Sequence, residues 1–146
     1  MTEERVVVIG AGVMGRGVAH VAALAGWQTT LTDLDADQLQ TAQQAIAGAL
    51  DKGIARGKAT ADDKARTLAN LALDTNWEGP AAAATWVVEA VPEDMGLKKR
   101  LFARLGEVAP ADAVLGSNTS SLSVTEIAAV TAHPERVIGT HFFNPV

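Results

Sequence analysis

Short apolar runs alternate with stretches of helical periodicity along the first part of the chain. Residues 5–9 (RVVVI) form a short run that is apolar and β-branched from Val6 onward, which is typical of a strand buried on both faces of a parallel sheet. From Val13 the apolar residues recur at helical spacing, and Gly26 stands where a glycine commonly ends a helix. A second strand is expected over residues 27–32 (WQTTLT). The segment therefore predicts a strand, helix, strand unit.

The same alternation continues to the end of the chain. The composition of residues 35–69 favours helix with a break near 53–58, which predicts two helices, and Thr60 with Asp63 forms a possible capping box. The other predicted elements are strands over 71–74, 85–91, 113–116 and 136–142, a helical turn at 81–84, a helix with the apolar stripe Leu97, Leu101, Leu105 and Val108, and a short helix opened by a capping box of Ser123 and Glu126. This order indicates the α/β class: a Rossmann-like, doubly wound, mainly parallel sheet with helices on both faces.

The composition fits one such domain over residues 1–146 and argues against several kinds of partner. With 146 residues, 48% of them apolar, the chain has the size of one domain with a hydrophobic core. A net charge of -5 leaves no basic face for nucleic acid or an anionic membrane. No apolar run approaches the roughly 20 residues of a membrane helix, and the start lacks the features of a signal peptide, so we expect a cytoplasmic protein. With no cysteine and three scattered histidines, no metal site is expected.

The turn after the first predicted strand reads GAGVMG and fits the dinucleotide-binding pattern G-x-G-x-x-G. A strand precedes it, a helix follows it, and an acidic residue ends the next strand, which is the context that makes the pattern specific. Gly10 permits the tight turn, Gly12 lets the backbone approach a pyrophosphate at the helix N-terminus, and Gly15 lets the helix pack closely on the sheet. The alternative is that the glycines only shape a tight turn.

Asp33 ends the second predicted strand and stands 23 positions after Gly10. A carboxylate at about this spacing accepts hydrogen bonds from the adenosine ribose and repels a 2′-phosphate. No arginine stands nearby to accept that phosphate, so NAD is favoured over NADP. Two other roles stay open for Asp33, a helix N-cap or a turn residue, and Asp35 and Asp37 could fill them as well.

Four segments of the chain resemble, in order and spacing, the NAD-binding domain of L-3-hydroxyacyl-CoA dehydrogenases. They are VVVIGAGVMGRGVA, VVEAVPED, SNTSSLSVTEIA and RVIGTHFFNPV. SNTSSL and HFFNP are much more specific than the glycine pattern. Members of that family oxidise the 3-hydroxyl of an acyl-CoA thioester by passing hydride to NAD, so the resemblance implies NAD as the cofactor and an acyl-CoA as the substrate.

The resemblance also implies roles for single residues. His141 would take the hydroxyl proton, Ser120 would contact the substrate oxygen, and Asn144 would help to hold substrate and nicotinamide. Arg56 matches the place of basic residues that meet the CoA phosphates, where a solvated basic turn is an equal alternative. The cofactor-binding residues implied by the glycine pattern and the resemblance together are Gly10, Gly12, Val13, Met14, Gly15, Asp33, Glu93, Lys98 and Asn118.

The chemistry of the reaction needs such a set. Removing hydride from the carbinol carbon leaves a protonated carbonyl unless a base takes the proton, and an imidazole suits that task in both directions. A hydroxyl and a carboxamide are suitable partners for an alkoxide-like oxygen. His141 also fits by position, because ligands of open α/β sheets bind beyond the carboxyl ends of the strands. A histidine between apolar residues can instead be a satisfied core group, and Phe142 and Phe143 are expected to serve packing.

The chain departs from the family pattern at its end. In the family a glutamate shortly after HFFNP pairs with the histidine, and a C-terminal helical domain closes the acyl site and forms most of the dimer interface. Neither occurs in this chain, so we expect the front part of a longer, homodimeric protein, which binds NADH but turns over acyl-CoA poorly. Two alternatives stay open: a dinucleotide-binding module without catalysis, and a related dehydrogenase of free 3-hydroxy acids, which would use a lysine base.

Overall fold

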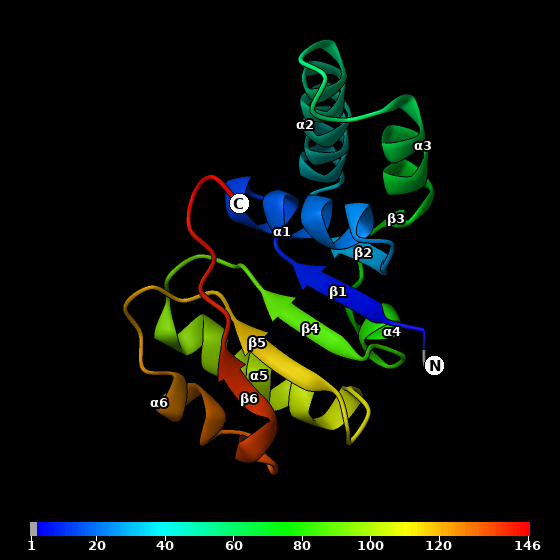
Figure 1. Cartoon of the computed structure of the whole chain (residues 1–146). Coiled ribbons are helices and arrows are strands. Elements are labelled where there is room, and N and C mark those ends of the chain that lie inside the picture. Colours follow the sequence, from blue (N-terminus) through cyan, green and yellow to red (C-terminus); the bar gives the residue numbers. More distant parts are fainter. Residues whose placement is uncertain (1–2) are drawn as a thin grey trace.

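Six strands form a central sheet in the order β3-β2-β1-β4-β5-β6 (Figure 1). The computed structural model describes residues 3–146. The strands are β1 (Arg5–Ile9), β2 (Gln28–Thr32), β3 (Leu71–Asp74), β4 (Trp86–Glu89), β5 (Val114–Ser117) and β6 (Val137–Gly139). All neighbouring pairs are parallel. The strand order reverses between β1 and β4, and doubly wound folds bind their ligands at such a switch point.

Helices cover both faces of the sheet (Figure 1). They are α1 (Val13–Leu24), α2 (Ala36–Ala55), α3 (Ala61–Ala69), α4 (Glu78–Ala81), α5 (Met95–Val108) and α6 (Val124–Ala128), with the short 3-10 helix η1 (Pro134–Arg136). The predicted doubly wound α/β fold is confirmed, and its sheet is parallel throughout. Among residues 3–146, no helix is both long enough and apolar enough to cross a membrane.

The core consists of one apolar cluster on each face of the sheet. Val6 and Val8 of β1 face a cluster that includes α1 and α2, whereas Val7 and Ile9 face a cluster that includes α5. Successive side chains of a strand point to opposite faces, so a strand covered on both faces must be apolar at every position. This requirement explains the unbroken apolar run of residues 6–9, all of which are buried.

The helix ends follow the sequence signals in most places. Gly26 has a φ of 97° directly after the end of α1, and the predicted capping box of Thr60 and Asp63 opens α3. At α6 only half of the predicted box forms. The Ser123 side chain accepts from the Glu126 backbone N–H, but the Glu126 carboxylate lies 3.3 Å from the Lys99 ammonium instead. An exposed ion pair has therefore replaced the second capping hydrogen bond.

Two predicted strands are shorter in the structure because side chains take their last hydrogen bonds. The strand expected over 85–91 ends at Glu89, since the Val91 N–H donates to the Glu89 carboxylate at 2.8 Å. The strand expected over 136–142 ends at Gly139, and the Phe142 N–H donates to the Asn118 side chain at 2.8 Å. The residues beyond both strands thus form loops at the carboxyl edge of the sheet.

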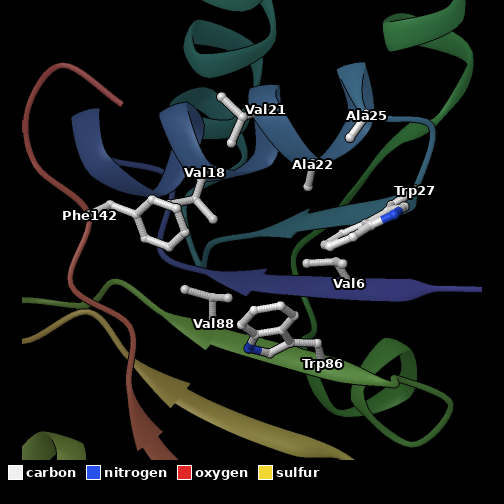
Figure 2. Close-up of a pocket in the computed structure, with 9 residues that line it drawn as sticks. All are labelled: Val6, Val18, Val21, Ala22, Ala25, Trp27, Trp86, Val88 and Phe142. Atoms are coloured by element: carbon white, nitrogen blue, oxygen red, sulfur yellow. The ribbon is translucent and has the colours of Figure 1, made fainter.

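An apolar pocket of about 240 Å³ lies between α1 and strands β1 and β4 (Figure 2). Its lining residues are Val6, Val18, Val21, Ala22, Ala25, Trp27, Trp86, Val88 and Phe142. The two indole rings lie 6.1 Å apart, and Phe142 enters the pocket from the C-terminal segment. Phe142 therefore anchors the segment that carries His141 to the face of the sheet.

Candidate active site

The glycine turn joins β1 to α1, and its three glycines face different surroundings. Gly10 has a φ of 106°, and a Cβ there would lie 2.4 Å from the Ala90 carbonyl oxygen. A Cβ on Gly15 would lie 1.7 Å from the carbonyl oxygen of Gly10. A Cβ on Gly12 would meet no atom within 4 Å. The fold itself requires Gly10 and Gly15, whereas the protein's own packing does not require Gly12.

Asp33 holds the glycine turn through its carboxylate. Its Oδ2 accepts from the Ala11 N–H at 2.9 Å, and its Oδ1 accepts from the Asp35 N–H at 2.9 Å. The N-cap of α2 is Asp35, whose side chain accepts from the N–H groups of Asp37 and Gln38. The N-cap alternative for Asp33 is therefore wrong, while its turn role exists alongside the contact with the glycine turn.

A pocket of about 250 Å³ opens beside Asp33 and Gly10. Its other lining residues are Ile9, Thr32, Leu34, Thr75, Trp77, Val91, Pro92, Leu97 and Leu101. Most of these side chains are apolar, and the Asp33 carboxylate is the charged group among them. Such a pocket suits a ligand with a flat apolar part and adjoining hydroxyl groups.

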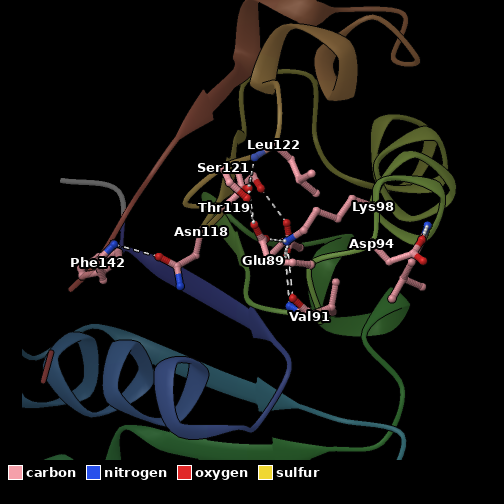
Figure 3. A network of polar contacts seen from close by, with 12 residues as sticks. Glu89, Val91, Asp94, Lys98, Asn118, Thr119, Ser121, Leu122 and Phe142 are labelled. Atoms are coloured by element: carbon pink, nitrogen blue, oxygen red, sulfur yellow. Dashed lines mark hydrogen bonds and ion pairs between the residues drawn. The ribbon is translucent and has the colours of Figure 1, made fainter. Parts of the chain in front are cut away.

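A buried ion pair lies between β4 and α5 (Figure 3). The side chains of Glu89 and Lys98 are both 0% exposed, and Lys98 Nζ lies 2.5 Å from Glu89 Oε2. The Glu89 carboxylate also accepts from Ser117 Oγ at 2.6 Å and from the Val91 N–H at 2.8 Å. Buried charges are tolerated when they are paired and hydrogen-bonded in this way. Sequence reasoning did not single out Glu89 or Ser117, and the available signal was one charged residue inside an apolar strand.

Glu93 connects this pair to the surface. Its Oε1 lies 3.1 Å from Lys98 Nζ, and its Oε2 accepts from Thr119 Oγ1 at 2.9 Å and Ser121 Oγ at 3.2 Å. Although burial raises the pKa of the Glu93 carboxyl, the hydrogen bonds from Lys98, Thr119 and Ser121 outweigh it and hold the pKa below its ordinary value. Glu93 is therefore ionised at neutral pH.

A cleft of about 380 Å³ contains all three predicted catalytic residues beyond the carboxyl ends of the strands. Its lining residues are Met14, Ala90, Val91, Pro92, Glu93, Asn118, Ser120, His141, Phe142, Phe143 and Asn144. Segments that are far apart in the sequence, from the first helix to the last residues, thus share one hollow. Its polar groups include an imidazole, a hydroxyl, two carboxamides and a carboxylate, which suit proton transfer and hydrogen bonding to a substrate oxygen.

His141 lies on the loop after β6 and is exposed, so the alternative of a satisfied core histidine is wrong. Asn118 fixes this loop by accepting the Phe142 N–H (Figure 3). The His141 ring lies 4.8 Å from the Phe143 ring, and Phe143 is 76% exposed. The expected packing role therefore holds for Phe142 alone. In the same loop, the Asn144–Pro145 peptide bond is cis.

Five predicted site residues line neither the pocket beside Asp33 nor the cleft: Gly12 and Gly15 of the glycine turn, and Val13, Arg56 and Lys98. Val13 is 54% exposed at the start of α1. Arg56 caps the end of α2 and is exposed to solvent. Lys98 is fully buried, and it reaches the cleft through the carboxylate of Glu93.

The sequence profile described as 3-hydroxyacyl-CoA dehydrogenase, NAD binding domain, matches residues 5–146. This chain belongs to that family. The predicted cofactor, NAD, is thereby confirmed at the level of the family domain.

The chain is similar to longer proteins that are named as dehydrogenases. The chain is 47% identical to 3-hydroxyadipyl-CoA dehydrogenase of Escherichia coli, over 97% of this chain and 30% of the relative. It is 39% identical to 3-hydroxybutyryl-CoA dehydrogenase of Bradyrhizobium diazoefficiens, over 98% of this chain and 48% of the relative. The domain thus spans half or less of the length of these relatives.

Solved structures agree with this membership. The crystal structure of 3-hydroxybutyryl-CoA dehydrogenase from E. coli superposes with a TM-score of 0.95 at 46% identity, covering 99% of this chain and 30% of that one. The crystal structure of (S)-3-hydroxybutyryl-CoA dehydrogenase from Ralstonia eutropha gives 0.92 at 36% identity, covering 98% and 50%. The parallel sheet and its helices therefore match the fold of these dehydrogenases.

Proposed function

We propose that this domain is the cofactor-binding part of an NAD-dependent 3-hydroxyacyl-CoA dehydrogenase and that it carries the catalytic base. The observation that supports this most strongly is the cleft in which His141, Ser120 and Asn144 lie together with Met14 from the start of α1. These residues come from three loops or helices at the same edge of the sheet, where open α/β folds bind their ligands.

The residues around the glycine turn fit the cofactor. Asp33 would accept hydrogen bonds from the adenosine ribose at the rim of its apolar pocket. The free space at Gly12, at the N-terminus of α1, leaves room for the pyrophosphate, whose charge the free N–H groups and the helix dipole stabilise. Met14 lies in the cleft with His141, on the side where the nicotinamide would be held. When bound, NAD supplies the acceptor for a hydride.

The catalytic roles follow from the chemistry of the side chains. The neutral imidazole of His141 takes the proton from the 3-hydroxyl as the carbinol carbon loses its hydride, which leaves a 3-oxo product. Ser120 and Asn144 donate hydrogen bonds to the oxygen while it carries negative charge. In the reverse direction the His141 imidazolium returns the proton to the oxygen. Its exposed position allows the imidazole to exchange protons with solvent.

The base assignment predicts a specific loss of activity. The chain is incubated with NADH and 3-oxobutyryl-CoA, and NADH oxidation is followed by absorbance. We expect turnover well below the roughly 1–10³ s⁻¹ of typical enzymes, and His141→Gln should reduce it by a further factor of about 10²–10⁴ without changing the Kd for NADH.

His133→Gln serves as the matched control. His133 is an exposed histidine that pairs with Glu135 at 3.1 Å, outside the cleft. Its variant should behave as the parent does, whereas equal turnover by the parent and His141→Gln would contradict the assignment. A chain that binds NADH and is indifferent to acyl-CoA would instead be a binding module without catalysis.

A further inference from the structure

Two loops border the cleft, and both are tied to one buried carboxylate. The first loop, residues 90–94, follows β4, and the second, residues 118–122, follows β5. Glu89 and Ser117, the last residues of these strands, are neighbours in the sheet register. Glu89 accepts from Ser117 and from Val91 in the first loop, so its carboxylate fixes the start of both loops.

Lys98 extends this connection to the cleft. Its Nζ lies 2.5 Å from Glu89, 3.1 Å from Glu93 and 3.4 Å from the Val91 carbonyl oxygen. The Lys98 side chain is 0% exposed, so the three oxygen atoms around its ammonium all come from the protein.

Glu93 carries the connection onward to the loop with the substrate serine. Its Oε2 accepts from the hydroxyls of Thr119 and Ser121, which flank Ser120 on either side. Thr119 Oγ1 in turn accepts the Leu122 N–H at 3.0 Å, which closes the turn. Ser120 itself is exposed and lines the cleft.

We propose that Lys98 is a positioning residue: held by Glu89, it fixes the Glu93 carboxylate, and Glu93 in turn holds the loop that presents Ser120 to the cleft. The proposal rests on the proposed function only in taking the cleft as the place where cofactor and substrate meet.

The arrangement needs the cation in particular. Glu89 and Glu93 place two carboxylates around one ammonium, and Glu89 is fully buried. Removing Lys98 alone would leave a buried, unpaired charge and risk unfolding. Replacing both partners of the buried pair by uncharged side chains of similar size avoids this cost and leaves Glu93 without its cation.

The test compares Glu89→Gln/Lys98→Met, Glu93→Gln and the triple variant in the full chain. Amide hydrogen exchange over residues 118–122 is measured without cofactor, and the Kd for NADH is measured by the fluorescence of the bound nucleotide. We expect exchange over this loop to speed up in each variant and the Kd to rise on the order of tenfold, a typical effect of an outer-shell partner. The exchange rate and the Kd of the triple variant should not exceed those of the more strongly affected of the other two variants, since Lys98 acts through Glu93.

Lys99→Met is the matched control, because Lys99 is the next residue of α5, is 39% exposed and pairs with Glu126. It should keep both parent values. If Glu89→Gln/Lys98→Met does not fold, Thr119→Val/Ser121→Ala removes the hydroxyls from the Glu93 side and should give the same faster exchange and weaker NADH binding.

Parent-like exchange and Kd in a folded variant would overturn the proposal. The proposal would also be overturned if the fold-increase in Kd of the triple variant equalled the product of the fold-increases of the other two variants, because Lys98 would then act independently of Glu93. The failure of the proposed function is separate: a parent chain that does not bind NADH refutes that function, whereas loop exchange without cofactor still tests the positioning role.

Discussion

At the scale of single residues, the three glycines of the turn look alike in the sequence but differ in the structure. Side chains on Gly10 and Gly15 would collide with backbone atoms, at 2.4 Å and 1.7 Å. A side chain on Gly12 would collide with nothing, and its backbone has a φ of -70°, which any residue can adopt. The packing of the fold therefore does not require a glycine at position 12, which agrees with the proposed approach of the pyrophosphate there.

This difference predicts that folding and binding can be separated by two substitutions. Gly12→Ala should keep the Tm of the parent and weaken NADH binding by about tenfold or more, because a methyl group enters the space of the pyrophosphate. Gly15→Ala should lower the free energy of unfolding by about 1–3 kcal/mol or more, because the helix must move away from the turn. Thermal unfolding and NADH titration measure the two effects. Parent-like binding by Gly12→Ala would show that no ligand approaches there.

The residues that the sequence could identify are those with local signals. The spacing of the glycines and of Asp33 predicted the cofactor side, and the family resemblance of SNTSSL and HFFNP predicted roles for Ser120 and His141. Glu89 could not be assigned, because its importance depends on Lys98 from a different element. The contact of Asp33 with the Ala11 N–H was missed for the same reason.

At the scale of the elements, α3 shows how much a short helix depends on its cap. It has nine residues, of which Thr67 is buried, so little tertiary packing holds it. Its first turn is closed by reciprocal hydrogen bonds between Thr60 and Asp63. Hydrogen bonds from the Thr60 backbone and side chain, and the nearby Arg66, hold the pKa of Asp63 below its ordinary value of 3.8.

The cap therefore predicts a dependence of stability on pH. A carboxyl whose pKa is lower in the folded state stabilises that state fully above its ordinary pKa, and this contribution is lost as the pH falls through the folded value. Asp63→Asn should be less stable than the parent at neutral pH, and the difference should shrink in acid. Urea unfolding at several pH values measures it, and a difference that stays constant down to acid pH would exclude the Asp63 charge as its cause.

Element types were predictable because hydrophobic periodicity reports burial, but several ends were not. Glu89 and Asn118 ended β4 and β6 early by taking backbone N–H groups that a longer strand would have used. At α6, Lys99 drew the Glu126 carboxylate away from its capping position. Such competition between side chains of different elements leaves no trace in local sequence patterns.

At the scale of the whole molecule, a pocket and a cleft lie side by side around the glycine turn. The pocket beside Asp33 and the cleft with His141 share Val91 and Pro92 in their linings. An extended ligand can therefore have one end at Asp33 and the other beside His141, with its middle at the start of α1. The reversal of strand order between β1 and β4 creates this arrangement. The alternation of strands and helices in the sequence predicted this fold, but not the shapes of the pocket and the cleft.

The most direct test of the central claim, that this domain binds NAD with Asp33 at the ribose, is a titration of the chain with NADH and with NADPH. Fluorescence of the bound nucleotide gives both Kd values under the same conditions. NADH should bind, and NADPH should bind at least about tenfold more weakly because the Asp33 carboxylate repels the 2′-phosphate. Absence of NADH binding, or equal affinity for the two nucleotides, would contradict the account.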